Sequence, residues 1–149
     1  MSYNAVSFVA QSQLTTWTDE LEFLCYIFCE LIDAKSLSAV GHEYHQAVDF
    51  LTLSHIIRPH LEASSESLTH IMSRDELVTF RRLLRKATEI RHVLAHHGII
   101  TMDKFNRLES TKQSLCDVLE ISIKKVASDR AIDQVCFDVK LLFDSLLIG

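Results

Sequence analysis

Apolar residues recur every three or four positions over most of this chain, the spacing that places them on one side of an α-helix. The pattern predicts five main helices, over about residues 18–34, 43–59, 73–91, 102–127 and 129–147. Only three glycines and one proline occur among the 149 residues, too few to turn a many-stranded sheet. We therefore expect an all-α fold, a bundle of about five helices in a single domain over residues 1–149.

Several residues indicate where these helices begin and end. Thr16 or Thr18 is the expected cap of the first helix, because a threonine hydroxyl accepts a hydrogen bond from a free backbone N–H. Pro59 is expected to kink or end the second helix, since proline has no backbone donor. Ser73 and Glu76 have the spacing of a capping box, which predicts the start of the third helix.

Four cysteines, at positions 25, 29, 116 and 136, are expected to be reduced core residues of an intracellular protein. A chain of this length buries enough surface to fold without disulfides. Cys25 and Cys29 are four residues apart on a helix, a spacing that also suits a metal, but small buried thiols are the preferred interpretation. We expect no metal and no cofactor.

The chain has no basic residue ahead of an N-terminal apolar run, and no segment approaches the roughly 20 apolar residues that span a membrane. A cytoplasmic protein without a membrane partner is the expectation. The net charge of −5 argues against binding nucleic acid with the whole surface but leaves room for a local basic stripe. Such a stripe occurs in the third helix, where the candidate RNA-binding residues are Arg81, Arg82, Arg85 and Lys86. Its alternative is a solvated face whose cations suit the C-terminal half of a helix.

Arg91 stands at the edge of the apolar side of the third helix. At roughly 100° per residue from Leu83, residues such as Phe80 fall on the inward face, and Arg91 projects at about 80°. A cation there is costly to desolvate unless an anion meets it. We expect either a carboxylate of the protein, such as Glu43 or Asp49, or a phosphate of a ligand.

Three histidines gather beside this arginine. His92 and His96 are four residues apart and so share a helix face, a spacing that can chelate zinc. No glutamate follows His92 and no third ligand is evident, so acid–base or hydrogen-bonding roles are preferred. His97 would point inward if the helix persisted, which makes it a rival candidate, and Gly98 is well placed to end the helix.

The segment Arg91-His-Val-Leu-Ala-His96 resembles the Arg-x4-His motif of HEPN-domain proteins. Its place at the end of a long helix near the middle of the chain suits that family. The resemblance implies a small helical homodimer in which two copies of the motif face each other and cleave RNA without a metal, leaving a 2′,3′-cyclic phosphate. Arg91 and His96 would then be catalytic, with His92 and His97 supporting them.

Two features of the sequence do not fit the function that the resemblance implies. Arg91 and His96 are about 140° apart on an ideal helix, so they converge only if the helix loosens or if they come from different chains. Many toxins of the family carry a tyrosine two residues after the histidine, as the target of an antitoxin nucleotidyltransferase, and this chain has Gly98 there. A nucleotidyltransferase-like antitoxin stays open as a partner through other contacts. The alternative to a ribonuclease, toxin or defence effector is a non-catalytic helical dimer that binds a protein or RNA.

Overall fold

The computed structural model describes residues 6–40 and 49–148, with only the backbone described beyond residue 131. Along this part of the chain the elements are β1 (Ser7–Val9), α1 (Gln11–Ala39), α2 (Phe50–Ile57), the short 3₁₀ helices η3 (Arg58–Leu61) and η4 (Ala63–Ser65), α3 (Arg74–Ala95), β2 (Ile99–Thr101) and α4 (Met102–Ile148). The expectation of a helical fold is confirmed. The expected number of helices is wrong, because the predicted fourth and fifth helices form one continuous helix, α4. Neither glycine nor proline occurs between residues 102 and 148, so nothing in the sequence breaks it.

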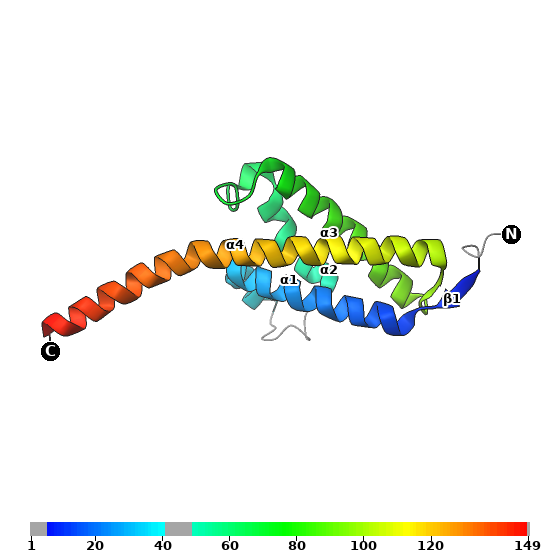
Figure 1. Cartoon of the computed structure of the whole chain (residues 1–149), viewed down its shortest axis with the longest axis horizontal. Coiled ribbons are helices and arrows are strands. Elements are labelled where there is room, and N and C mark those ends of the chain that lie inside the picture. Colours follow the sequence, from blue (N-terminus) through cyan, green and yellow to red (C-terminus); the bar gives the residue numbers. More distant parts are fainter. Residues whose placement is uncertain (1–5, 41–48, 149) are drawn as a thin grey trace.

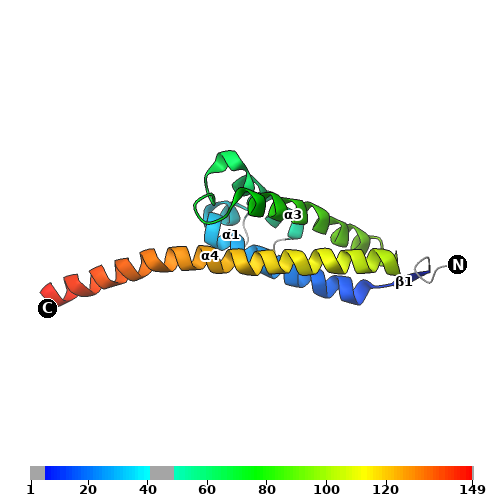
Figure 2. The same ribbon diagram turned by 45° about the horizontal axis from the view of Figure 1, so that its top comes forward.

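The three long helices lie lengthwise beside one another (Figures 1 and 2). Helix α1 packs against α2 and α4, and α3 packs against α4 and α1. In Figure 1, α1 and α4 run in the same direction and α3 runs in the opposite one. The C-terminal part of α4 extends beyond the other helices in both views.

The core lies where these helices meet. Phe28 of α1 and Phe80 of α3 are both fully buried, with ring centroids 5.3 Å apart. Three of the four cysteines, at positions 25, 29 and 116, are buried free thiols as predicted, while the side chain of Cys136 lies outside the described residues. Burial raises the pKa of Cys29 to about 12, with a smaller contribution from Asp33. These thiols therefore stay protonated and pack as small apolar groups.

A two-stranded antiparallel sheet, which the sequence pattern did not predict, joins the start of the chain to its middle. Ser7 pairs with Thr101 and Val9 with Ile99. The backbone nitrogen of Ala10 then donates to the carbonyl oxygen of Gly98, at 2.8 Å. This contact ties the residue before α1 to the end of α3.

The predicted start and cap of the first helix are therefore wrong. Helix α1 begins at Gln11, its N-cap is Ala10, and no side chain makes a capping hydrogen bond there. The hydroxyls of Thr16 and Thr18 instead donate to the backbone carbonyls four residues earlier, inside the helix.

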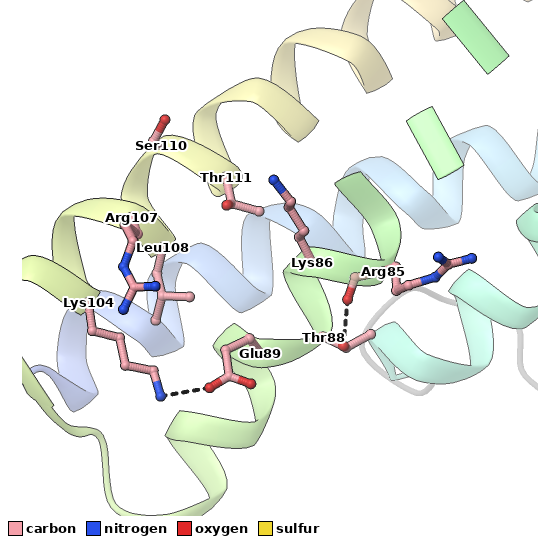
Figure 3. A pocket seen from close by; sticks show the side chains of 9 residues that line it. All are labelled: Arg85, Lys86, Thr88, Glu89, Lys104, Arg107, Leu108, Ser110 and Thr111. Carbon is pink, nitrogen blue, oxygen red and sulfur yellow. Dashed lines mark hydrogen bonds and ion pairs between the residues drawn. The ribbon is translucent and has the colours of Figure 1, made fainter. Parts of the chain in front are cut away.

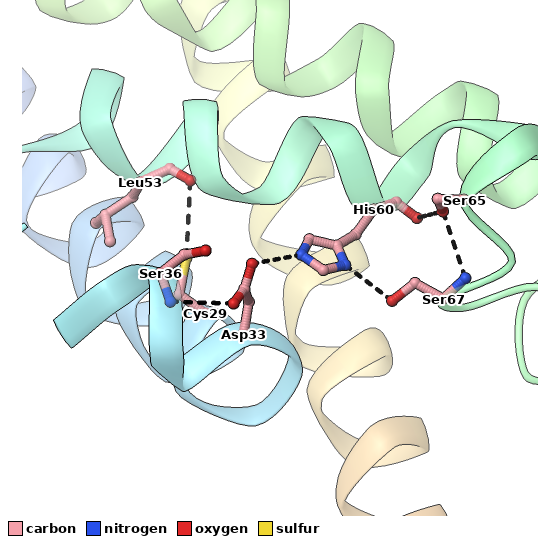
Figure 4. Close-up of polar contacts among 7 residues, drawn as sticks. All are labelled: Cys29, Asp33, Ser36, Leu53, His60, Ser65 and Ser67. Atoms are coloured by element: carbon pink, nitrogen blue, oxygen red, sulfur yellow. Dashed lines mark hydrogen bonds and ion pairs between the residues drawn. The ribbon is translucent and has the colours of Figure 1, made fainter. Parts of the chain in front are cut away.

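Helix α1 is kinked at Asp33, which has non-helical backbone angles (φ −159°, ψ 60°). One carboxylate oxygen, Oδ1, accepts a hydrogen bond from the backbone nitrogen of Ser36 at 3.1 Å, so Asp33 caps the segment after the kink. The other, Oδ2, lies 2.8 Å from Nε2 of His60, whose Nδ1 lies 2.8 Å from Oγ of Ser67 (Figure 4). The hydrogen bond with His60 is the main reason that the pKa of Asp33 is lowered.

Helix α2 begins later than predicted. Asp49 has extended backbone angles and accepts a hydrogen bond from the backbone nitrogen of Thr52 at 2.9 Å, so it is the N-cap. The prediction that the helix already includes residue 49 is therefore wrong. Residues 43–48 of the predicted helix lie outside the described residues. Pro59 does end the α-helix as predicted, since α2 stops at Ile57 and the proline lies in η3.

The predicted start of α3 is confirmed. Ser73 is the N-cap, its hydroxyl accepts from the backbone nitrogen of Glu76 at 3.2 Å, and Oε1 of Glu76 accepts from the backbone nitrogen of Ser73 at 3.0 Å. The inward face is also as expected, with Phe80, Leu83 and Ile90 buried. Helix α3 therefore presents the Arg91 segment at its far end from this cap.

Candidate functional site at the end of helix α3

Helix α3 stays regular through Ala95, and the chain leaves it over the next three residues. His96 is the C-cap, and His97 and Gly98 both have positive φ, at 72° and 67°. The backbone nitrogen of Gly98 donates to the carbonyl oxygen of Val93 at 2.9 Å, so the prediction that Gly98 ends the helix is confirmed. Because the helix does not loosen between Arg91 and Ala95, Arg91 and His96 start from directions about 140° apart.

Gly98 is required by the local structure. A Cβ atom at this position would lie 2.9 Å from both the Cα and the backbone nitrogen of Gln11, in addition to the strain of the positive φ. Backbone atoms at the start of α1 cannot move away as a flexible side chain would. A large side chain such as that of tyrosine therefore does not fit at this position.

Arg91 meets an anion of the protein, as expected. Its Nη2 lies 3.2 Å from Oδ2 of Asp49, one of the two predicted carboxylates, while Glu43 lies outside the described residues. The side chains of Arg91 and Asp49 are 38% and 44% exposed, so the pair is half in solvent. An ion pair of this exposure contributes about 0–1 kcal/mol, and it leaves the guanidinium within reach of a ligand.

Two carboxylates next to Arg91 have opposite pKa shifts. Burial raises the pKa of Glu22, although Oε2 of Glu22 accepts a 2.7 Å hydrogen bond from the backbone nitrogen of Phe50. Burial also acts to raise the pKa of Asp49, but hydrogen bonds from Thr52 and the charge of Arg91 outweigh it, and the net shift is downward. Asp49 is therefore the anionic partner of Arg91 at neutral pH.

The three histidines lie on the surface. The rings of His92 and His96 are in edge-to-face contact with centroids 4.5 Å apart, and both residues are exposed. His97 is exposed too. It was expected to point inward only if the helix persisted, and that condition is not met, because α3 ends at Ala95 and the positive φ of His97 takes it out of the helical path. Within the described residues, no group of three or more His, Cys, Asp or Glu side chains is placed to hold a metal ion.

A surface hollow of about 710 Å³ lies between α3 and α4. Four cationic side chains and one carboxylate line it: Arg85, Lys86 and Glu89 from α3, and Lys104 and Arg107 from α4 (Figure 3). We call it the cationic hollow. Lys104 and Arg107 were not among the residues predicted from the sequence. Their spacing of three residues at the start of α4 is visible in the sequence, but only the packing of α4 on α3 shows which surface they share.

The predicted RNA-binding residues do not all reach this hollow. Arg85 and Lys86 line it, although the side chain of Arg85 is directed away from α4 in Figure 3. Arg81 lies elsewhere, where its Nη1 is 3.3 Å from Oε2 of Glu62. Arg82 is exposed and is not part of the hollow. The basic stripe thus divides between two surfaces of the helix.

Comparisons with protein-family models, with curated proteins and with solved structures find no match to this chain. Among the helices in the described ranges, none has an apolar stretch long enough to cross a bilayer. The site is therefore interpreted from its residues.

Proposed function

We propose that this chain is a metal-independent endoribonuclease of HEPN type, a toxin or defence effector that acts on RNA in the cytoplasm. The observation that carries the proposal is that the Arg91–His96 segment, which resembles the family motif, lies at a surface helix end with three exposed histidines, and that His92 follows Glu89 of the cationic hollow by about one helical turn. The guanidinium, the imidazoles and a cationic surface are the groups that cleavage of an RNA backbone requires.

The proposed reaction is attack of a ribose 2′-hydroxyl on the adjacent phosphorus. The bond from phosphorus to the 5′-oxygen breaks, and the products are a 2′,3′-cyclic phosphate and a 5′-hydroxyl. One imidazole takes the proton from the 2′-hydroxyl, and another delivers a proton to the leaving oxygen. Arg91 stabilises the charge that develops on the non-bridging oxygens.

The divergence of Arg91 and His96 supports a composite site in a homodimer. Two side chains that leave one helix about 140° apart converge poorly on one phosphate within a protomer. A second copy of the chain places its His96 beside the Arg91 of the first copy. The two copies together then provide two imidazoles, one for each proton transfer. His92 contacts His96 and supports it, and His97 is the rival acid–base group.

A second candidate function, a non-catalytic module that binds RNA or a protein partner, is favoured by one specific contact. Arg91 is already paired with Asp49 of its own chain, an arrangement that suits a packing role. A phosphate ligand would have to compete with that carboxylate.

The deciding experiment incubates purified protein with RNA in excess chelator and resolves the products. A cyclic phosphate product that is lost in both Arg91→Ala and His96→Ala, with the solution mass of a dimer unchanged, supports the nuclease. Arg74→Ala is the matched control, since it removes an exposed arginine from the first turn of the same helix, outside the hollow. RNA that stays intact while still binding supports the module instead, and a strictly monomeric protein contradicts the composite site.

A further inference from the structure

The cationic hollow concentrates positive charge on a chain that is acidic as a whole. Its lining has four cations against one carboxylate, whereas the full chain has a net charge of −5. Lys86 and Arg107 form no ion pair with any described residue. Cations brought together from two helices without neutralising partners repel one another, so the site gains stability when an anion binds.

The remaining lining residues suit phosphate as well. Thr111 adds a hydroxyl from α4 beside Lys86, and Ser110 also belongs to the lining, although its hydroxyl is directed away from Lys86 (Figure 3). Hydroxyl and cationic side chains are the groups that contact phosphate oxygens in protein–nucleic acid complexes. The hollow is open and carries one apolar side chain, Leu108, among its nine lining residues, so it does not resemble the enclosed apolar pocket of a small-molecule site.

Glu89, at the edge of the hollow's lining, is the residue that connects the hollow to the histidine pair. Glu89, His92 and His96 are three and four residues apart, so they follow one another along one face of α3. The pKa of Glu89 is lowered first by its hydrogen bond from Lys104, and the charges of His92 and Arg107 lower it further. Glu89 thus lies between the cations of the hollow and the first of the two histidines.

We propose that the cationic hollow between α3 and α4 binds the phosphate backbone of RNA and guides it to His92 and His96. This inference rests on the proposed RNA substrate but not on cleavage. Glu89 competes with the backbone, because its Oε1 holds Nζ of Lys104 at 2.7 Å. A phosphate that enters the hollow takes the place of Glu89 on Lys104.

The test measures binding of a short fluorescent 2′-O-methyl oligoribonucleotide by anisotropy at several salt concentrations. This probe keeps the RNA backbone but lacks the 2′-hydroxyl needed for cleavage, so binding is read apart from catalysis. Lys86→Gln and Arg107→Gln should each weaken binding roughly three- to tenfold and reduce the slope of log affinity against log salt by about 1. Arg107→Lys should keep most of the affinity, and Glu89→Gln should raise it.

Arg74→Gln is the matched control, because it removes an exposed cation from the first turn of the same helix, outside the hollow. Circular dichroism confirms that each variant is folded. The proposal is overturned if Lys86→Gln and Arg107→Gln weaken binding no more than Arg74→Gln does, or if Glu89→Gln weakens it. It is also overturned if the hollow binds inorganic polyphosphate but not the oligoribonucleotide. Hollow-dependent binding without cleavage of natural RNA supports this inference and contradicts the nuclease.

Discussion

Gly98 accepts a hydrogen bond on its carbonyl oxygen from the backbone nitrogen of Ala10, so the end of α3 and the start of α1 meet through backbone atoms. There is no space for a side chain at Gly98, and its φ is positive. Gly98→Ala should therefore lower the free energy of unfolding by about 2–3 kcal/mol, measured by urea denaturation.

Gly98→Asn separates the effect of the positive φ from the effect of the close contact with Gln11. Asparagine tolerates a positive φ better than alanine does, but its Cβ meets the same backbone of Gln11. We expect Gly98→Asn to be less damaging than Gly98→Ala and still destabilising. Wild-type stability in both variants would show that the close approach to Gln11 is not present.

The carboxylate of Asp33 stabilises the kink of α1 in two ways, as the cap for Ser36 and as the partner of His60. Asp33→Ala removes both contacts and should cost about 1–2 kcal/mol of unfolding free energy. Asp33→Asn keeps a capping oxygen and should cost less. Thermal unfolding of the two variants side by side tests this order, and equal losses would mean that the cap contributes nothing.

Asp49→Asn should free Arg91 while it preserves the start of α2. Asparagine is as good an N-cap as aspartate, so the hydrogen bond from Thr52 is kept and only the charge opposite Arg91 is lost. The change in unfolding free energy should stay within about 1 kcal/mol, because the pair is half exposed. If Arg91 binds phosphate as proposed, RNA affinity or cleavage rises in this variant, whereas a fall in both would assign Asp49 itself to the site.

Glu76 should make stability depend on pH in the acid range. Its hydrogen bonds from Lys125, at 2.6 Å, and from the backbone of Ser73 lower its pKa from 4.5 to about 2. A lowered pKa means that the contribution is complete above pH 4.5 and is lost as the pH falls towards 2.

The melting temperature of Glu76→Gln should therefore fall less between these two pH values than that of the wild-type protein. The difference at neutral pH should be below about 1 kcal/mol, since Glu76 is largely exposed and glutamine can still complete the capping box. Lys124→Gln serves as the control because Lys124 is an exposed lysine next to the one that Glu76 binds. Parallel pH profiles for Glu76→Gln and wild type would contradict the assignment.

The parts of the fold that were predicted correctly depend on residues close together in sequence. A few neighbouring residues determine the capping box of Ser73 and Glu76, and the same holds for the helix end at Gly98. The structure has both features. The two short strands were missed because three residues such as Ser7–Val9 carry no usable periodicity. They are strands only because Ile99–Thr101 lies opposite them.

The candidate site, too, was predicted correctly only where residues close together in sequence determine it. Helical projection predicted that Arg91 needs an anion and named Asp49 among the alternatives, but only the packing of α2 against α3 selects it. Lys104 and Arg107 join Lys86 through the contact between α3 and α4, which no local pattern encodes. The projection left the position of His97 dependent on whether the helix persists, and its positive φ shows that the chain already turns there.

The pairing of Ser7 with Thr101 closes a loop that contains α1, α2 and α3. During synthesis the first strand leaves the ribosome long before its partner exists, so it stays unpaired while most of the helical residues emerge. Contacts between residues so far apart in sequence slow the search for the native state. The pairing of β1 with β2 is therefore expected to form among the last steps of folding. The end of α3, with its histidines, reaches its final geometry only then.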